Sequence, residues 1–481
     1  MGQYREFRIK GGNDPTWTPA RLKEGVTTQM RHRRTMLLMA IFQLAVLLSV
    51  VTVARNEAVA QDGTWATLAP IPTGPRFGLA VGAVNGVLYA VGGFCESVHP
   101  EGCGSAGAGF LDAVDAYNPT SNTWTGKAPM STGRYYLAAA QVNGMLYAVG
   151  GAGLAGSYLP TSEAYDPTLN VWTTKAPMPT PRQAPAAAMV DGILYVVGGF
   201  NDAGFTLPTV EAYNPVTDTW TTKAPMPTPR LALALAVVNR AIYALGGLFD
   251  APPTTRLFLQ TVEAYDPLTD TWTTKAQMPT PRFGLAAGII NEKIYVVGGK
   301  ESDSSNPLAT VSVYDPSTNT WAAGNAMPTA RWLLAAETID EKLYAVGGCT
   351  DVTCAAIVST LEAYAPVIDV AVDIQPGTFP NTINPKSKGR IPVSILTTDT
   401  FDATTVDATT VRFGATGKEA APVHFALQDA NGDGKLDMIL EFKTQDTHIV
   451  CGESSASLTG KTVGGQAIKG SDSVKTAGCK K

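Results

Sequence analysis

A short segment of the sequence, DANGDGKLD, spaces oxygen-bearing side chains in a way that suits a hard metal ion. Its first, third, fifth and ninth positions are Asp429, Asn431, Asp433 and Asp437. The sixth position is Gly434, which permits the sharp turn that such a loop needs. Ca²⁺ binds several oxygen ligands at once, and this spacing lets one tight loop supply them. The same residue types are also common in ordinary hairpin turns, which is the alternative interpretation.

The loop resembles the calcium loops of dockerins and integrin-type β-repeats more than an EF-hand. An EF-hand has a bidentate Glu at its twelfth position. Here that position is Leu440, and Glu441 stands one place later. The flanking residues predict strands rather than the paired helices of a regulatory site. We therefore expect a structural Ca²⁺ in this loop.

A second set of candidate residues recurs at regular intervals. One Arg ends each segment of the PxPR type, namely Arg76, Arg134, Arg182, Arg230, Arg282 and Arg331. If these side chains met at one end of the molecule, they would form a ring of positive charge for an anionic ligand. The alternative is that each Arg braces the loop of the neighbouring repeat. Because the six copies are identical, whereas binding sites usually break symmetry, we favour the structural role.

The residues that follow these Arg residues, and those that follow each Gly-Gly pair, do break the symmetry. Most are aromatic and one is a Lys: Phe77, Phe94, Tyr135, Tyr136, Phe200, Phe283, Lys300 and Trp332. Aromatic side chains stack on sugar rings and anchor protein interfaces, so these residues are candidates for a ligand-binding rim. The alternative, that they only fill a central channel, stays open.

An internal repeat determines the elements that position these residues. Six Gly-Gly pairs occur 48 to 58 residues apart, each at the end of a short apolar run with a Tyr, such as LYAVGG. A second Tyr follows, at Tyr117, Tyr165, Tyr213, Tyr265, Tyr314 and Tyr364. In the first five repeats a Trp stands seven residues later, at Trp124, Trp172, Trp220, Trp272 and Trp321. Each unit predicts four short antiparallel strands.

Residues 62–366 resemble the kelch family, in which each repeat forms one blade of a β-propeller. The sixth repeat has Ala371 where its Trp would stand, and an unpaired Trp65 precedes the first repeat. We therefore expect the strand around Trp65 to complete blade six and close the ring. The predicted fold is all-β: a six-bladed kelch propeller over residues 61–366, closed by an N-terminal strand, followed by a small β-sandwich.

Some kelch relatives are enzymes, and each chemistry can be tested against the residues present. Galactose-oxidase-like members hold copper with Tyr and His ligands, but His99 is the only His between residues 61 and 366, so we expect no copper. Relatives of the sialic-acid epimerase or mutarotase type would need a rim carboxylate or His for acid–base work. No spacing singles out a pair among the loop carboxylates Asp112, Asp202, Asp250, Glu301 and Asp351. We therefore name no catalytic residue.

The six Cys residues are expected to form disulfides, because the chain carries signs of export. Local pairing predicts the bonds Cys95–Cys103, Cys349–Cys354 and Cys451–Cys479. The first two would stiffen loops on the candidate rim.

The repeat stops at Val367, and alternating runs such as IPVSILTT and MILEFK follow. These runs predict a compact β-sandwich over residues 367–481, with the candidate calcium loop inside it. The region resembles C-terminal modules of exported bacterial proteins.

Residues 1–60 are predicted to direct export. Three Arg residues at positions 31–34 precede an uncharged run over residues 35–54, and Ala58-Val59-Ala60 offers a cleavage site. The run is long enough for an uncleaved membrane anchor, which is the alternative, and Met30 is a candidate start. Without residues 1–60 the net charge is 27 − 37 = −10. We expect no nucleic-acid partner, because phosphate binding needs clustered basic residues.

The sequence thus predicts a secreted or cell-envelope binding protein whose rim recognises an extracellular glycan or protein. The alternative is a carbohydrate-active enzyme, a sugar epimerase or mutarotase, acting at the same rim. Membrane contact is expected only if the N-terminal segment stays as an anchor.

Overall fold

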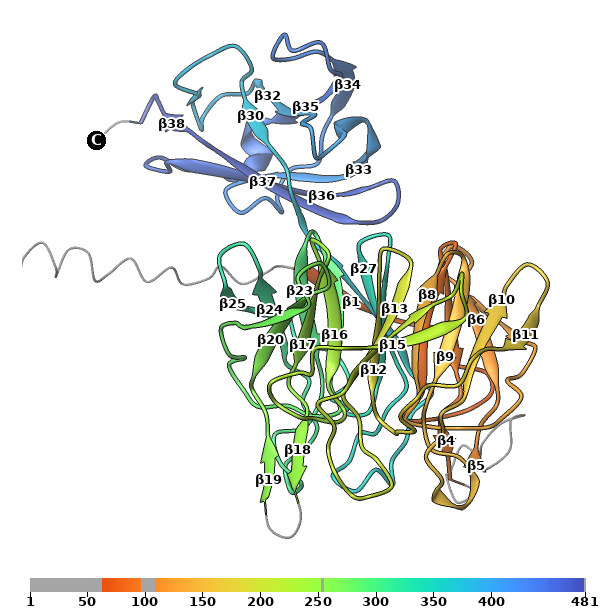
Figure 1. The fold of residues 1–481 in the computed structure, drawn as a ribbon. Helices are drawn as coiled ribbons and strands as arrows, with labels where there is room; N and C mark the ends of the chain where they lie inside the picture. The colour runs from red at the N-terminus through yellow and green to blue at the C-terminus, as the bar shows by residue number, and fades with distance from the viewer. Residues whose placement is uncertain (1–62, 97–108, 252–254, 480–481) are drawn as a thin grey trace, which may run out of the picture. The chain divides into compact units, whose positions relative to one another are not determined.

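The computed structural model describes residues 63–96, 109–251 and 255–479 (Figure 1). The predicted export segment, His99 and Cys103 lie outside these residues. The described residues form an all-β fold, as predicted, with three single-turn 3₁₀ helices: η2 (Leu154–Gly156), η3 (Ala403–Thr405) and η4 (Thr444–Thr447). No helix in this part of the chain is long and apolar enough to span a membrane.

Six four-stranded antiparallel sheets lie between residues 63 and 366, and we number them as blades one to six. The strands of blade one are β2 (Ala80–Val84), β3 (Val87–Val91), β6 (Val114–Asn118) and β7 (Thr123–Lys127). Those of blade two are β8 (Ala138–Val142), β9 (Met145–Val149), β10 (Ser162–Asp166) and β11 (Val171–Thr174). Those of blade three are β12 (Ala186–Val190), β13 (Ile193–Val197), β14 (Val210–Asn214) and β15 (Thr219–Lys223).

The second half of the propeller repeats this order. The strands of blade four are β16 (Ala234–Val238), β17 (Ala241–Leu245), β20 (Val262–Asp266) and β21 (Thr271–Thr274). Those of blade five are β22 (Ala286–Ile290), β23 (Lys293–Val297), β24 (Val311–Asp315) and β25 (Thr320–Gly324). Those of blade six are β26 (Ala335–Ile339), β27 (Lys342–Val346), β28 (Leu361–Pro366) and β1 (Gly63–Leu68).

The first strands of the six blades pack against one another in chain order, and β26 of blade six packs back against β2 of blade one. β1 pairs antiparallel with β28, and Trp65 lies directly opposite Tyr364. The strand that precedes blade one therefore forms the outer strand of blade six, so the two ends of the repeat region are joined by main-chain hydrogen bonds.

The recurring Tyr and Trp side chains lie where neighbouring blades meet. The ring centroids of Tyr165 and Trp172 are 5.2 Å apart, and Tyr165 is fully buried. Trp172 Nε1 donates to the carbonyl oxygen of Ala128, which follows blade one, at 2.9 Å. The amide of Ala128 in turn donates to Asn170 Oδ1 at 2.9 Å. Each repeat thus encodes its contact with the preceding blade as well as its own sheet.

The Gly pairs let the backbones of adjoining blades approach closely. Gly198 and Gly199 have φ values of 68° and 108°, in the region that favours Gly. The amide of Gly199 donates to the carbonyl oxygen of Arg230 in the next blade at 2.9 Å. A Cβ on Gly198 would lie 2.5 Å from the same oxygen. A larger residue would therefore push blades three and four apart.

Residues 368–476 form two four-stranded sheets around a core of their own. The strands of one sheet are β29 (Ile368–Asp369), β37 (Ala467–Ser473), β36 (Ser455–Thr462) and β33 (Val406–Gly414). Those of the other are β30 (Val372–Ile374), β32 (Arg390–Ile395), β35 (Asp437–Lys443) and β34 (His424–Gln428). β31 (Thr382–Ile383) and β38 (Lys475–Thr476) form a short parallel pair.

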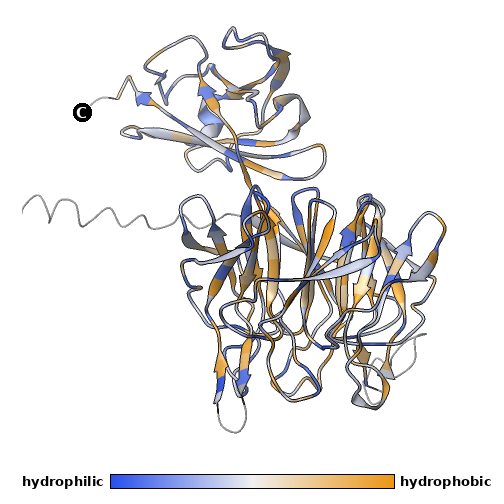
Figure 2. Ribbon diagram, viewed as in Figure 1, coloured by the Kyte–Doolittle hydropathy of each residue, from blue (hydrophilic) through white to orange (hydrophobic). Residues whose placement is uncertain are grey.

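Both sheets of this region contribute to a single buried cluster. Phe413 and Leu458 come from one sheet, and Val393 and Phe442 come from the other. Two sheets that share one apolar core are the arrangement expected of the predicted β-sandwich. Figure 2 shows apolar residues concentrated along the strands in both parts of the chain.

Candidate functional site

The six recurring Arg side chains are buried within the blades, each at most 2% exposed. Five of them form ion pairs with buried carboxylates: Arg76–Asp115, Arg134–Glu163, Arg182–Glu211, Arg230–Glu263 and Arg331–Glu362. In blade five Arg282 instead donates to Ser312 Oγ at 3.0 Å. Burial lowers the pKa of Arg134 to about 10, and the nearby Glu163 partly offsets this effect. Buried and paired side chains cannot form a ring of charge for an anionic ligand.

The structural role differs in one detail from the prediction that each Arg braces a neighbouring blade. Arg182 donates to the carbonyl oxygens of Gly198 and Thr209, both at 3.2 Å, and pairs with Glu211, all in its own blade. The link to the preceding blade comes from the backbone, because the carbonyl oxygen of Arg182 accepts from the amide of Gly151 at 3.0 Å. The prediction was wrong for the side chain, because the sequence does not show whether an Arg in this loop turns into its own blade or into the neighbouring one.

The candidate rim residues lie at the end of the propeller where the second strand of each blade ends; we call this end the loop face. There, the residue after each Arg forms a single β-bridge with the residue after the Gly pair of the same blade. The six bridges are Phe77–Phe94, Tyr135–Ala152, Gln183–Phe200, Leu231–Leu248, Phe283–Lys300 and Trp332–Cys349. The bridges form one layer of residues across the loop face.

Blades one and two contribute an aromatic cluster to this layer. The centroid of the Tyr135 ring lies 4.3 Å from that of Tyr136, 5.5 Å from that of Phe94 and 6.1 Å from that of Phe77. Phe110, which the sequence analysis did not single out, packs edge-on against both Phe94 and Tyr135, with ring centroids 5.4 Å apart in each pair. Phe77 is buried and fills space between blades, whereas Tyr136 is half-buried, with its pKa raised by partial desolvation. Phe94 and Tyr135 are half-buried at the surface of the cluster.

Blades five and six contribute a second group, centred on Trp332. The ring centroids of Phe283 and Trp332 are 5.4 Å apart, and Lys300 Nζ lies 4.4 Å from the Trp332 ring centroid. Lys300 is 1% exposed, and its ammonium donates to the carbonyl oxygens of Asp303 and Val352 at 2.9 and 2.8 Å. Lys300 therefore joins two loops and holds the Trp332 ring, rather than presenting its charge to solvent.

A pocket of ≈ 200 Å³ opens beside this second group. Its wall includes Tyr136, Leu231, Phe283 and Trp332, and it also includes the charged pair Arg256 and Asp303, whose side chains are 3.4 Å apart. Of the predicted rim residues, the structure thus gathers Tyr136, Phe283 and Trp332 around one pocket. Phe200 does not line it and packs against Tyr158, with ring centroids 6.3 Å apart.

The sequence analysis missed Arg256 and Asp303 because both lie in loops between second and third strands. Arg256 is on the hairpin of β18 (Leu248–Ala251) and β19 (Thr255–Phe258), which projects from blade four (Figure 1). The available signal was the wider spacing of 52 residues between the Gly pairs that flank this loop. An insertion in one repeat of a propeller lengthens a loop on one face, which is often the binding face.

Two of the predicted disulfides are present. Cys349 is bonded to Cys354 in the loop after the last Gly pair, and Cys451 is bonded to Cys479 in the C-terminal region. The first disulfide lies beside the rim layer, because Cys349 forms a main-chain β-bridge with Trp332. The third predicted pair involves Cys103, which lies outside the described residues.

The candidate calcium loop is closed by hydrogen bonds to Asp429. Its carboxylate accepts from the amides of Gly432, Asp433 and Gly434 at 2.7, 3.2 and 2.9 Å, and these donors lower its pKa. Asn431 Nδ2 lies 3.2 Å from Asp433 Oδ2. These oxygens are of the hard type that Ca²⁺ prefers.

Asp437 stands apart from the other three predicted ligands, at the buried start of β35. Its two oxygens accept from the amides of Thr397 and Ala430, at 2.7 and 2.9 Å. In the part of the chain that the structure describes, no group of three His, Cys, Asp or Glu side chains is arranged to hold a metal ion. Calcium binding by this loop stays a prediction. Asp437 holds the base of the loop through its hydrogen bonds to the amides of Thr397 and Ala430.

Comparison with known proteins agrees with the repeat geometry. Residues 63–247 match the family model described as the KLHDC2/KLHL20/DRC7 Kelch-repeats domain, and residues 229–279 and 281–328 match the Kelch motif. The chain is similar to Kelch-like ECH-associated protein 1B of Danio rerio, with 39% identity over 93 residues, 19% of this chain and 14% of that protein. It is similar to Kelch-like protein 28 of Homo sapiens, with 34% identity over 91 residues, 19% of this chain and 15% of that protein.

These matches span a small part of the relatives' own length. They indicate a shared repeat and do not transfer the activity of a whole relative to this chain. Among solved structures, one titled "Structure of YjhT" aligns with a TM-score of 0.52 and 18% identity, over 62% of this chain and 97% of that chain. At this identity the likeness concerns the fold alone. The two family models together indicate that residues 63–328 of the propeller are built from kelch repeats.

Proposed function

We propose that this protein is an exported binding protein whose loop face takes a protein ligand. The observation that carries the proposal is the pocket beside Trp332, together with the apolar side chains that the surrounding loops leave in solvent. Leu154, Phe205 and Leu257 are 80%, 52% and 51% exposed, and they lie in the loops between second and third strands of blades two, three and four. Exposed apolar side chains on the same face as an apolar pocket favour a macromolecular partner.

The size of the pocket also favours a protein ligand. At ≈ 200 Å³ it is below the range of about 300–1,000 Å³ that holds drug-sized molecules, and it suits one large side chain. Its wall is held rigid, because Trp332 Nε1 donates to the carbonyl oxygen of Asp351 at 3.0 Å while Lys300 packs against the ring. A preformed apolar pocket with a polar pair at its edge is the usual place for an anchoring residue of a partner.

The protein-ligand proposal is supported by one relative, whose name, Kelch-like ECH-associated protein 1B, records association with another protein. The export part of the proposal is supported by the two disulfides, which persist in oxidising compartments. The alternative, a sugar-acting enzyme, would need a carboxylate free to exchange protons in this pocket. Among the described residues, the one carboxylate that lines it, Asp303, is paired with Arg256.

The test is a selection of phage-displayed random peptides on the full chain, with a glycan array measured in parallel. We expect peptides with an aromatic or aliphatic anchor, and we expect Trp332→Ala and Leu257→Asp to lose them. The matched control is Leu268→Asp, since Leu268 is 87% exposed on the same blade but in the turn between β20 and β21, at the opposite end. Glycan binding that Trp332→Ala abolishes, with no peptide selected, would contradict the protein-ligand proposal and favour a carbohydrate.

A further inference from the structure

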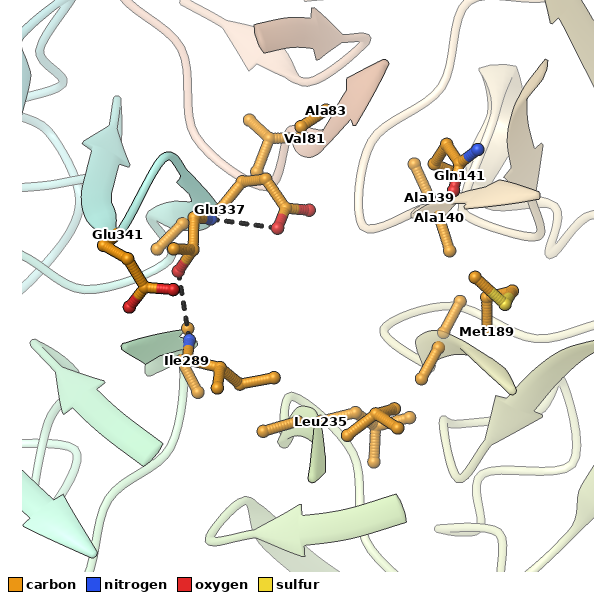
Figure 3. A pocket seen from close by; sticks show the side chains of 18 of the residues that line it. Val81, Ala83, Ala139, Ala140, Gln141, Met189, Leu235, Ile289, Glu337 and Glu341 are labelled. Atoms are coloured by element: carbon orange, nitrogen blue, oxygen red, sulfur yellow. Dashed lines mark hydrogen bonds between the residues drawn. The ribbon is translucent and has the colours of Figure 1, made fainter. Parts of the chain in front are cut away.

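A cavity of ≈ 660 Å³ runs along the centre of the propeller and is lined by the first strands of all six blades (Figure 3). Most of its wall consists of small or aliphatic side chains, such as Ala140, Ala188, Leu235 and Ile289. It reaches the end of the propeller opposite the loop face, where Asp340 and Glu341 form the turn between β26 and β27. The pocket beside Trp332 shares no residue with it.

One carboxyl group breaks the symmetry of this channel. The middle residue of each first strand lies opposite the Tyr of the second strand, so the six middle positions can be compared directly. Blades one to six have Gly82, Ala140, Ala188, Ala236, Gly288 and Glu337 at this position. A propeller blade therefore does not need an acidic residue here.

The side chain of Glu337 has little to compensate its charge. Its Oε1 accepts one hydrogen bond, from the amide of Thr338 at 2.9 Å, and none of the ion pairs in the described residues includes it (Figure 3). The strands packed against β26 present Val81, Ala83 and Ile289 to the channel, none of which is charged. Loss of contact with water raises the pKa of Glu337 to about 7.

The other charged groups that line the channel have the same sign. They are Asp340 and Glu341, and Glu341 Oε2 is engaged by the amide of Asn291 at 2.7 Å. Gln141, on blade two and two blades away from Glu337, adds a neutral polar group (Figure 3). A half-buried carboxylate in an apolar cavity with an acidic opening lacks a counter-charge, and a cation small enough to enter would supply it.

We propose that the central channel binds a small organic cation, an ammonium group carried on a short apolar chain, with Glu337 as its counter-ion. The ammonium would pair with the Glu337 carboxylate, and the chain would lie against the Ala and Leu side chains of the wall. A bare divalent metal fits less well, because Glu337 offers only one carboxylate and the wall around it is apolar. A neutral apolar ligand would leave the carboxylate without a partner.

The experiment is isothermal titration calorimetry of the full chain with n-alkylammonium chlorides, from ethyl to hexyl, and with the matching alcohols. We expect the amines to bind at pH 8 and the alcohols not to bind. Affinity for the amines should fall by about tenfold at pH 6, because a carboxyl with a pKa of about 7 is then mostly protonated. At pH 7, titrations in buffers of different ionisation enthalpy should report release of about half a proton per amine bound.

Glu337→Ala should abolish amine binding, and it should fold, because Ala occupies this position in three other blades. Glu341→Gln removes a carboxylate at the opening but leaves Glu337 in place, so its affinity should stay within about threefold of the parent. Absence of amine binding by the parent chain at pH 8, equal binding by Glu337→Ala, or equal binding of the alcohols would each overturn the proposal.

Discussion

Blade five offers a natural control for the buried ion pairs of the other blades. In blade three, Arg182 is paired with Glu211, which also accepts from Thr180 Oγ1 at 2.7 Å. In blade five, Ser312 takes the place of the carboxylate and accepts from the guanidinium of Arg282 at 3.0 Å. The same fold thus holds one Arg with a charged partner and another with a neutral partner.

We expect Glu211→Ala to destabilise the propeller by about 3–5 kcal/mol, because it leaves the buried guanidinium of Arg182 without its counter-charge. Ser312→Ala removes one hydrogen bond to a charged group and should cost about 1.5–3 kcal/mol. The double variant Arg182→Met with Glu211→Leu should be more stable than Glu211→Ala, because no buried charge remains. The order of the three, rather than any single value, identifies desolvated charge as the cause.

Urea unfolding followed by Trp fluorescence measures these differences as shifts of the midpoint at an unchanged m value. If Glu211→Ala costs no more than Ser312→Ala, the carboxylate does not compensate a buried charge. If the double variant is the least stable of the three, the pair is held by packing rather than by electrostatics. Either result would refute the structural role assigned to the Arg set.

Three further perturbations test other parts of the molecule. Removal of calcium with EDTA should lower the melting temperature of the C-terminal sandwich by about 4–8 °C per kcal/mol of lost binding energy. Asp429→Ala should abolish this response, whereas Asp446→Ala, a change at an exposed carboxylate outside the loop, should keep it. Because the folded-state pKa of Glu337 is raised, the folded protein retains a proton that the unfolded chain releases above about pH 4. The free energy of unfolding should therefore fall by up to about 3 kcal/mol between pH 4 and pH 7. Glu337→Gln should be more stable than the parent at pH 8 but not at pH 4. A difference between the two proteins that does not depend on pH would contradict the raised pKa. Trp65→Ala should cost about 3 kcal/mol in urea unfolding, because it removes the indole that packs against Tyr364 in the strand pairing that closes the ring. A loss below about 1 kcal/mol would show that this contact contributes little.

The sequence was sufficient for the parts of the fold that repeat. The Tyr and Trp of each unit have the same contacts in successive blades, as Trp172, Trp220 and Trp272 show by donating to Ala128, Ala176 and Ala224. Trp65 could be matched to Tyr364 because every other Tyr of that kind had its Trp seven residues later. Periodicity fixes such positions because the same environment is built six times.

The candidate site could be predicted only in part, because loops do not follow the repeat. Phe283 and Trp332 were found from their place after an Arg, but Arg256 and Asp303 reach the pocket from loops of unequal length. Lys300 was predicted as a residue of the ligand-binding rim, and the structure buries it over Trp332. Burial of a Lys depends on carbonyl oxygens of two separate loops, which sequence spacing does not reveal.

Departures from the repeat are therefore the best guide to what this propeller does. A residue that is the same in every blade, such as the Arg of each loop, is explained by the contact it makes within or between blades. Trp332, Glu337 and Cys349 differ from their counterparts and all belong to blade six, which is completed by β1. The two proposed binding sites, at the loop face and in the channel, both depend on this blade, whereas the remaining blades supply the rigid frame that holds them.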